Sequence, residues 1–214
     1  MALANCSNCG KSTEVSIPRS INTALDPELK SRVRDGSLFI WECPYCGRRS
    51  VAVSETLYHD PSSKLMLWLL PGTAEPSEAA QEAVKGLEGY TLRIVREVGE
   101  LIEKINIADA GLEDTTIEMC KWVTRRELSA KNPAAADARL KFLRTEGADH
   151  DLVFAFPLEG NMQLVNVGFN VYEDARGIIS RNPAVKPSEG FSEVNLHKGK
   201  KSHQLTVCCN SISR

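Results

Sequence analysis

Cys43-Pro44-Tyr45-Cys46-Gly47 is the stretch on which the fold depends, because an earlier stretch repeats its form. Cys6-Ser7-Asn8-Cys9-Gly10 also has two cysteines separated by two residues and followed by a glycine. Together the two units supply four thiolates, which is the full ligand set of a closed tetrahedral zinc site. Each glycine falls where the chain must turn back, and glycine tolerates the positive φ that such a turn often needs. We therefore predict a structural zinc ion with Cys6, Cys9, Cys43 and Cys46 as its ligands.

The bulk composition is that of a soluble globular protein. Apolar residues make up 42% and charged residues 25% of the 214 residues, which excludes a disordered chain. The net charge of −2 and the pI of about 6.1 exclude a strong positive field that would recruit nucleic acid or anionic lipid. The longest apolar run, 65–70, is far shorter than a membrane span.

The cysteine usage points to a compartment. The N-terminus lacks a basic segment followed by a long apolar one, so we expect no secretory signal. Seven cysteines without an export signal favour a reducing cytoplasm, where paired C-x-x-C units bind metal rather than form disulfides. We therefore expect a cytoplasmic protein.

The first 72 residues have the pattern of β-ribbons with a helical insertion. Asp26-Pro27-Glu28 is typical of a helix start, with Asp26 as the cap and Pro27 in the first helical position, and Gly36 ends the helix. Tyr58-His59-Asp60-Pro61 is typical of a turn. We expect strands at 14–17, 38–41, 51–53 and 64–70, the last buried on both faces.

The remaining sequence predicts helices followed by strands. The stripe of Val98, Leu101, Ile102 and Ile105 indicates a helix whose residues Glu100, Glu103 and Lys104 lie on the solvated face. We expect further helices at 77–87, at about 117–128 and from 132 to about 145, with 90–95 either a strand or part of a helix. We expect strands at 152–156, 163–167, 168–172 and 204–208, a hairpin turn at 159–161 and a loop at 180–190.

These expectations combine into an α+β fold. A zinc ribbon of β-hairpins spans 1–72, a helical segment spans 73–147, and antiparallel strands occupy 148–214. The apolar strand at 64–70 needs cover on both faces, so one continuous domain built from all three parts is the alternative.

Several stretches together resemble the CpXC domain family of prokaryotes. They are the paired cysteines, 21–22 before 25–30, 35–38 before the second Cys pair, and 57–60. The resemblance is strongest over 1–70 and continues through 92–95 and 100–105. Ser7 stands where the doubled pattern has proline, which affects the stiffness of the knuckle and not its ligands. The resemblance implies a unit found in cytoplasmic prokaryotic proteins, but it implies little about function, because the family's function is uncharacterised.

A redox function is the first alternative. Cys43-Pro44-Tyr45-Cys46 has the same letters as the glutaredoxin active site. A redox C-x-x-C motif needs its first cysteine at a helix N-terminus, whereas here Gly47-Arg48-Arg49 and a β-prone segment follow. A thiol–disulfide oxidoreductase also leaves Cys6 and Cys9 unexplained, so it ranks below structural zinc.

A hydrolase built around His59 and Asp60 is the second alternative. A carboxylate beside an imidazole could orient a general base. Adjacent residues rarely face each other, so we favour a turn in which Asp60 caps its own backbone and His59 packs on a neighbour.

Three other features carry weaker hypotheses. Cys120 lies on an apolar helical stripe and is expected in the core. Arg48-Arg49 with Trp41 and Tyr45 is an aromatic–basic cluster of the kind that binds nucleic acid, although solvated arginines explain it more simply. A second metal site could use Cys208 or Cys209 with His197 or His203.

The sequence thus favours a zinc-binding, non-catalytic module that contacts another protein. We expect no catalytic residue, no membrane association and no nucleic-acid partner. The sequence does not identify the partner or the oligomeric state.

Overall fold

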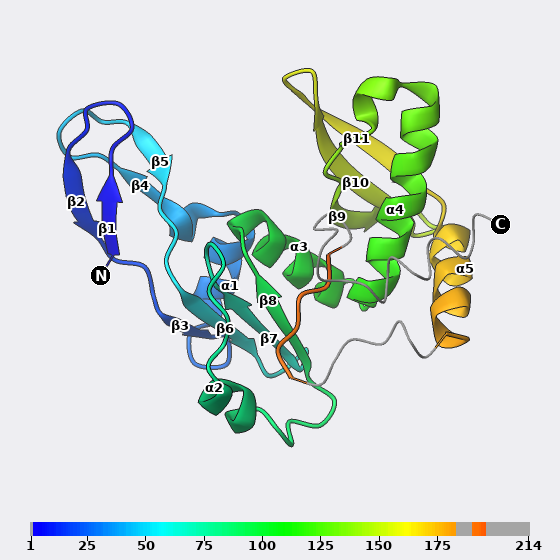
Figure 1. The fold of residues 1–214 in the computed structure, drawn as a ribbon, viewed down its shortest axis with the longest axis horizontal. Coiled ribbons are helices and arrows are strands. Elements are labelled where there is room, and N and C mark those ends of the chain that lie inside the picture. Colours follow the sequence, from blue (N-terminus) through cyan, green and yellow to red (C-terminus); the bar gives the residue numbers. More distant parts are fainter. Residues whose placement is uncertain (1, 183–189, 196–214) are drawn as a thin grey trace. The chain divides into compact units, whose positions relative to one another are not determined.

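The structure, a computed structural model, describes residues 2–182 and 190–195. It is a mixed α+β protein with N-terminal β-hairpins and C-terminal antiparallel strands, which confirms the expected fold class (Figure 1). The chain forms two compact units. Of the described residues, unit 1 comprises 2–102 and 190–192, and unit 2 comprises 103–182 and 193–195.

Two short antiparallel hairpins carry the four N-terminal cysteines. Strand β1 (Ala2–Asn5) pairs with β2 (Ser12–Val15), and β4 (Ile40–Glu42) pairs with β5 (Arg49–Val51). The expected strand at 38–41 is partly wrong, because η1 (Ser37–Phe39) is a 3₁₀ turn that precedes β4. Both hairpins alternate, so that Ala4 and Trp41 are buried while their neighbours face solvent.

The helix expected between the Cys pairs is α1 (Pro27–Arg34). Pro27 opens it, and Gly36, with φ of 76°, follows its C-terminal end as predicted. The capping role expected of Asp26 is wrong. Its backbone, with ψ of 73°, is outside the extended conformation of a usual N-cap, and its side chain makes no capping hydrogen bond.

The main sheet of unit 1 has four strands in the order β3-β6-β7-β8. Only the β6–β7 pair is antiparallel. The expected turn at 58–61 is wrong for its first three residues, which belong to β6, because the chain turns only at Pro61. The strands are β3 (Ser20–Asn22), β6 (Thr56–Asp60), β7 (Leu65–Leu69) and β8 (Thr91–Val95).

Strand β7 lies inside this sheet, and its two faces differ. Leu65, Leu67 and Leu69 are at most 3% exposed, whereas Met66 and Trp68 are half-buried in a second apolar cluster that includes Phe191. The expected burial on both faces is therefore complete for the face of Leu65, Leu67 and Leu69 and only partial for the other face. The expected helix at 77–87 is α2 (Glu78–Ala83), which Ser77 caps through a hydrogen bond from the backbone N–H of Ala80.

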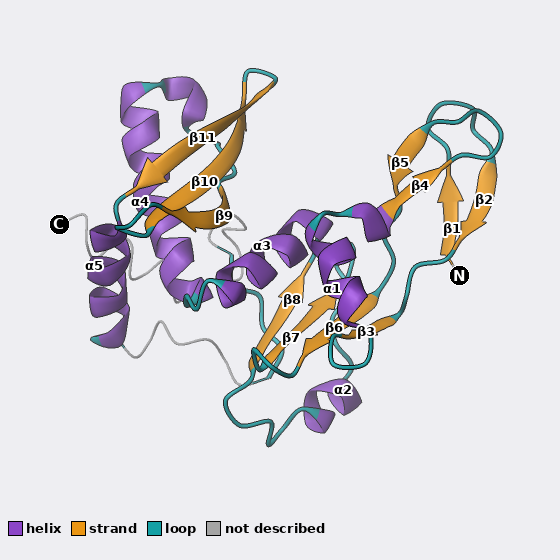
Figure 2. Cartoon of the chain, turned by 180° about the vertical axis from the view of Figure 1, so that it is seen from behind, coloured by secondary structure: helices purple, strands orange, loops and turns teal. Residues whose placement is uncertain are grey.

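Unit 2 packs helices against a three-stranded antiparallel sheet of order β11-β10-β9 (Figure 2). Its core contains Phe142, Phe154 and Ile117, each fully buried. Helix α3 (Val98–Asp109) begins in unit 1 and ends in unit 2. The other elements are α4 (Asp114–Lys131), η2 (Pro133–Ala135), β9 (Lys141–Glu146), β10 (Asp151–Leu158), β11 (Asn161–Val167) and α5 (Phe169–Ser180).

Two expectations for unit 2 are wrong. Asn132-Pro133 opens only the 3₁₀ turn η2, and 141–146 forms β9 because it pairs with β10. The segment 168–172 begins helix α5 and is not a strand. The buried residues of α5 recur at helical spacing, and they are Tyr172, Ala175 and Ile179. The sequence therefore contained the apolar pattern that predicts this helix.

No helix in 2–182 or 190–195 has the length and the apolar character needed to cross a membrane. The expected strand at 204–208 and the suggested second metal site, of Cys208 or Cys209 with His197 or His203, lie outside the described residues. The division of the chain at residues 72 and 147 stays a prediction.

Candidate metal centre

The two C-x-x-C-G units form the same loop. In the first, Gly10 N donates to the Cys6 carbonyl, and Cys6 N donates to the Lys11 carbonyl, both at 2.9 Å. In the second, Gly47 N donates to the Cys43 carbonyl, and Cys43 N donates to the Arg48 carbonyl, again at 2.9 Å. Gly10 and Gly47 have φ of 71° and 69°, as the sequence predicted. Each loop closes its own hairpin and turns both of its sulfurs to one side.

The four sulfurs converge on one point between the hairpins. All four Sγ atoms lie within 4.8 Å of one another. Cys6 Sγ is 3.6 Å from Cys46 Sγ, and Cys9 Sγ is 3.7 Å from Cys43 Sγ. Tetrahedral coordination with metal–sulfur bonds of about 2.3 Å places sulfurs about 3.8 Å apart. The cluster therefore has the dimensions of a four-cysteine metal site, and these residues can hold a metal ion.

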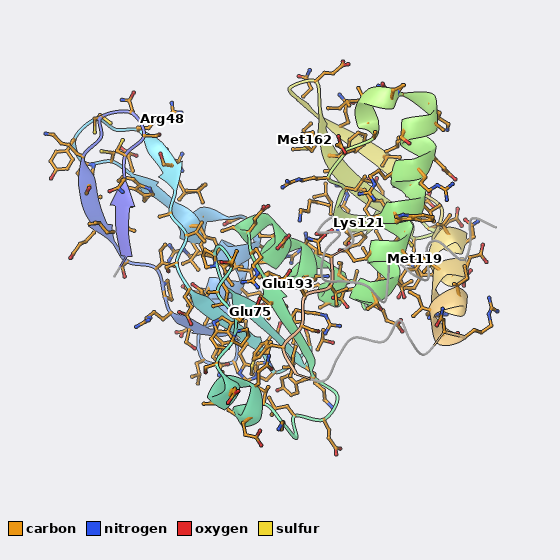
Figure 3. All side chains as sticks on the ribbon, in the orientation of Figure 1. Arg48, Glu75, Met119, Lys121, Met162 and Glu193 are labelled. Atoms are coloured by element: carbon orange, nitrogen blue, oxygen red, sulfur yellow. The ribbon has the colours of Figure 1, made fainter. Side chains whose placement is uncertain are left out.

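The burial of the ligands is the same in both loops. Cys6 and Cys43, the first cysteine of each pair, are at most 2% exposed, whereas Cys9 and Cys46 face solvent. All four are free thiols. The hairpins lie side by side with their Cys loops at the same end, where Figure 3 labels Arg48. The centre thus joins the two hairpins at their tips.

The local electrostatics shift the pKa values of Cys46 and Cys9 in opposite directions. Hydrogen bonds from the Asn8 side chain and the Arg48 backbone N–H lower the pKa of Cys46 to about 6. The backbone N–H of Lys11 favours the Cys9 thiolate, but partial desolvation of the sulfur and the three neighbouring sulfurs outweigh it and raise the pKa of Cys9 to about 11. Thiolates this close repel one another, so a cation is needed to ionise all four together.

The loop that carries Cys43 and Cys46 lacks the helix that a redox motif requires. Cys43 and Cys46 lie between β4 and β5, and no helix begins at either cysteine. The helix dipole that would favour a reactive thiolate is therefore missing from this loop.

The aromatic–basic cluster suggested for nucleic acid is only partly assembled. Arg48, Arg49 and Tyr45 are exposed, but Trp41 is 9% exposed and is not available to stack on a base. Lys11 Nζ lies 4.4 Å from the centre of the Tyr45 ring, which gives a cation–π contact between the two knuckles.

His59 and Asp60 are not brought together. Neighbouring residues of a strand point to opposite faces, and His59 Nε2 lies 3.2 Å from the Tyr90 hydroxyl. The buried Asp60 carboxylate instead accepts hydrogen bonds from Lys30 Nζ at 2.8 Å and Ser62 Oγ at 2.6 Å. Asp60 does cap the turn that follows it, as expected, and the structure holds no His–Asp pair here.

Sequence reasoning missed a cluster of buried charges in unit 2. Glu103 and Lys104 were expected on a solvated face, but they are 2% and 5% exposed. Lys121 Nζ lies 3.0 Å from Glu103 Oε1 and 2.7 Å from Glu118 Oε1, while Lys104 Nζ lies 2.9 Å from Asp114 Oδ2. Glu103 also accepts the Phe142 backbone N–H at 2.9 Å. The available signal was the helical spacing of Asp114, Glu118 and Lys121, which places three charges on one face of α4.

The remaining expectations for single residues are mixed. Glu100, also expected in solvent, is buried, and its Oε2 accepts the Arg96 backbone N–H at 2.8 Å. Cys120 lies in the core of unit 2 as predicted, where burial raises the pKa of its thiol to about 12. Cys120 is therefore an inert core residue.

Comparison with known proteins gives one family. A search of curated proteins and a search of solved structures gave no match. The family of CpXC proteins matches residues 4–121, which is more than half of the chain. The matched segment contains both Cys loops and extends well beyond the first 70 residues, where the resemblance was strongest. The chain therefore belongs to the CpXC protein family.

Proposed function

We propose that this chain binds one zinc ion through Cys6, Cys9, Cys43 and Cys46, and that the ion is structural. The observation that carries the proposal is the convergence of two loops with matching backbone hydrogen bonds on one point, with sulfurs at tetrahedral spacing. Zinc is the metal for which four thiolates in this arrangement are typical.

The ligand set favours structure over catalysis. A catalytic zinc ion keeps one position open for water or substrate, whereas four cysteines fill the coordination shell. Cys6 and Cys43 are also buried between the hairpins, so exchange of a ligand at the centre would open the fold. A reducing prokaryotic cytoplasm, which we propose as the location, would keep the thiols available to the metal.

We further propose that the hairpins present a surface to another protein. Ile40 and Val51 are direct cross-strand partners, and they are 41% and 62% exposed. Tyr45 at the nearby knuckle is 58% exposed. Exposed apolar side chains on a rigid scaffold suit a protein partner better than a phosphate backbone, and the net charge of −2 adds no attraction for nucleic acid.

The zinc proposal is tested by native mass spectrometry on protein purified without chelator, with thiols counted before and after the metal is stripped. We expect one zinc ion per chain and four thiols that react only after stripping. Cys120→Ala is the matched control, because it removes a buried thiol that is not a ligand and should keep the metal. Metal-free protein in which Cys43 and Cys46 interconvert with a disulfide would instead favour the oxidoreductase.

The surface proposal needs its own variants. Ile40→Lys with Val51→Lys should abolish binding of a partner captured by the zinc-loaded protein, and Leu25→Lys, which places a lysine at a 77% exposed position elsewhere, should not. Unchanged binding by the Ile40→Lys, Val51→Lys variant would assign the interaction to another surface.

A further inference from the structure

Strand β11 is an edge strand that no other described part of the chain covers. It is seven residues long, contains no charged residue and no proline, and pairs only on its β10 side among the described residues. Met162 and Leu164 are 68% and 57% exposed, and Met162 lies near the hairpin end of the strand (Figure 3). Edges of this length and composition are templates for pairing with another strand.

The other edges of the two larger sheets are protected. Strand β9, the opposite edge of the same sheet, carries Lys141, Arg144 and Glu146, and its pairing with β10 is interrupted by an irregularity in register. Strand β3 has only three residues. The edge of β8 is covered, because Ile94 N donates to the Ser192 carbonyl at 3.0 Å. Among these edges, only β11 combines length, lack of charge and exposed apolar side chains.

The turn before β11 determines which backbone groups face outward. Glu159 and Gly160 have φ of 51° and 79°, and Leu158 is paired with Asn161, so the loop is a two-residue turn of the primed type. In such a hairpin the two residues that flank the loop form backbone hydrogen bonds with each other. From there along each strand, every second residue forms such bonds with its partner on the other strand. The N–H and C=O groups of Met162, Leu164 and Asn166 therefore point to the free edge.

We propose that this edge binds the β11 strand of a second copy of the chain, antiparallel and about a two-fold axis at Leu164. Leu164 is the central residue of β11, so this pairing matches Leu164 with its own copy and Met162 with Asn166 of the other strand. All three positions present their backbone groups outward, and each matched pair can exchange reciprocal hydrogen bonds. The result is one continuous sheet across the two copies.

The composition of the strand favours a copy of itself as the occupant. A two-fold axis at Leu164 places this residue directly opposite its own equivalent, so a charge at this position would face a like charge. Strand β11 has none, and the apolar side chains of Leu164 and Met162 would cluster across the axis. This inference concerns a surface remote in sequence from the metal ligands, and it does not depend on the proposed function.

The first test is the association state of the zinc-loaded full chain by sedimentation over a range of concentrations. We expect a dimer that Leu164→Lys weakens at least tenfold, because the substitution places two ammonium groups side by side. Leu25→Lys introduces the same charge at another exposed leucine and should leave the dimer unchanged. A monomer at all concentrations, or a dimer that Leu164→Lys leaves intact, would overturn the proposal.

Amide hydrogen exchange read by NMR distinguishes the possible occupants of the edge. The Val165 N–H points to β10 and should be protected at every concentration, whereas the Leu164 N–H should become protected only as the dimer forms. Protection of Leu164 in the monomer would show that another segment of the same chain covers the edge, and would overturn the proposal. Fast exchange of the Leu164 N–H in the dimer would place the interface elsewhere and would also overturn the proposal.

Discussion

The metal-centre hairpins and unit 2 are stabilised by different means. The hairpins have strands of three or four residues, and isolated two-stranded ribbons are marginal in water. Unit 2 combines strands of six to eight residues with an 18-residue helix around a continuous apolar core. The comparison explains why the proposed ion would matter most for the hairpins, while unit 2 has enough buried apolar surface to carry paired charges inside it.

Cys43→Ser should have the largest effect of the changes considered. It removes a buried ligand, and structural zinc contributes about 10 kcal/mol or more to the folding of small modules. We expect loss of zinc and unfolding of the two hairpins, with unit 2 intact. Metal content and residue-resolved NMR spectra measure the two effects together. A variant that lacks zinc but keeps native thermal stability would contradict a structural role for the metal.

Lys121→Met tests the buried charges of unit 2. Burial opposes the ionisation of Glu103, but Lys121 and Lys141 outweigh it and hold the pKa of Glu103 below its ordinary value. Removing Lys121 leaves Glu103 and Glu118 buried without their nearest cation, which should cost about 3–5 kcal/mol. Denaturant unfolding followed by a probe in unit 2 measures the loss.

The matched control for this change is Lys131→Met at the other end of α4, where the lysine is exposed. It should change stability by no more than about 0.5 kcal/mol. Similar effects of the two substitutions would mean that the buried pairs add no stability beyond that of a surface charge.

Asp60→Asn tests a buried charge in unit 1, and we expect it to reduce stability less than Lys121→Met does. Burial opposes the charge of Asp60, but hydrogen bonds from Lys30 and Ser62 hold its pKa far below the usual value. A carboxyl group whose pKa is lower in the folded state stabilises the fold at pH values above its unfolded-state pKa of about 3.9. This stabilisation is lost as the pH falls through the folded-state pKa. We expect a loss of about 2 kcal/mol at neutral pH that shrinks below about pH 4.

Asp26→Asn is the control for this substitution, because Asp26 is exposed and its side chain makes no capping bond. Its unfolding free energy should match that of the wild type at every pH. A pH-independent loss in Asp60→Asn would assign the effect to packing and not to the carboxylate.

The predictions that succeeded rest on local chemistry. The C-x-x-C-G spacing predicted the knuckles because the loop hydrogen bonds and the positive φ are set within five residues. Pro27 and Gly36 likewise marked the limits of α1. The hairpin turn at Glu159 and Gly160 followed from the same reasoning.

The predictions that failed depend on partners distant in sequence. Glu103 looks like a surface residue until Lys121 and the Phe142 backbone N–H are placed beside it. Segment 141–146 contains no strong helix breaker, and its pairing with β10 decides its structure. Hydrophobic periodicity and secondary-structure propensity describe one segment at a time, so they do not predict buried ion pairs or strand pairing between distant segments.

Gly47→Ala should have the smallest effect, and it probes the hairpins without removing a ligand. Gly47 has φ of 69°, and apart from its own and its chain neighbours' atoms nothing lies within 4 Å of the position that a Cβ would occupy, so the cost is conformational only. A left-handed backbone costs an alanine about 1–2 kcal/mol, which corresponds to about a 5- to 30-fold loss of zinc affinity.

Gly99→Ala in α3 is the control, because this position also has open space around it. The substitution should raise stability by up to about 1 kcal/mol without changing zinc affinity. Competition with a chelator measures the affinities. If both variants bind zinc as the wild type does, the positive φ of the knuckle is not a requirement of the site, and the ligands alone determine its geometry.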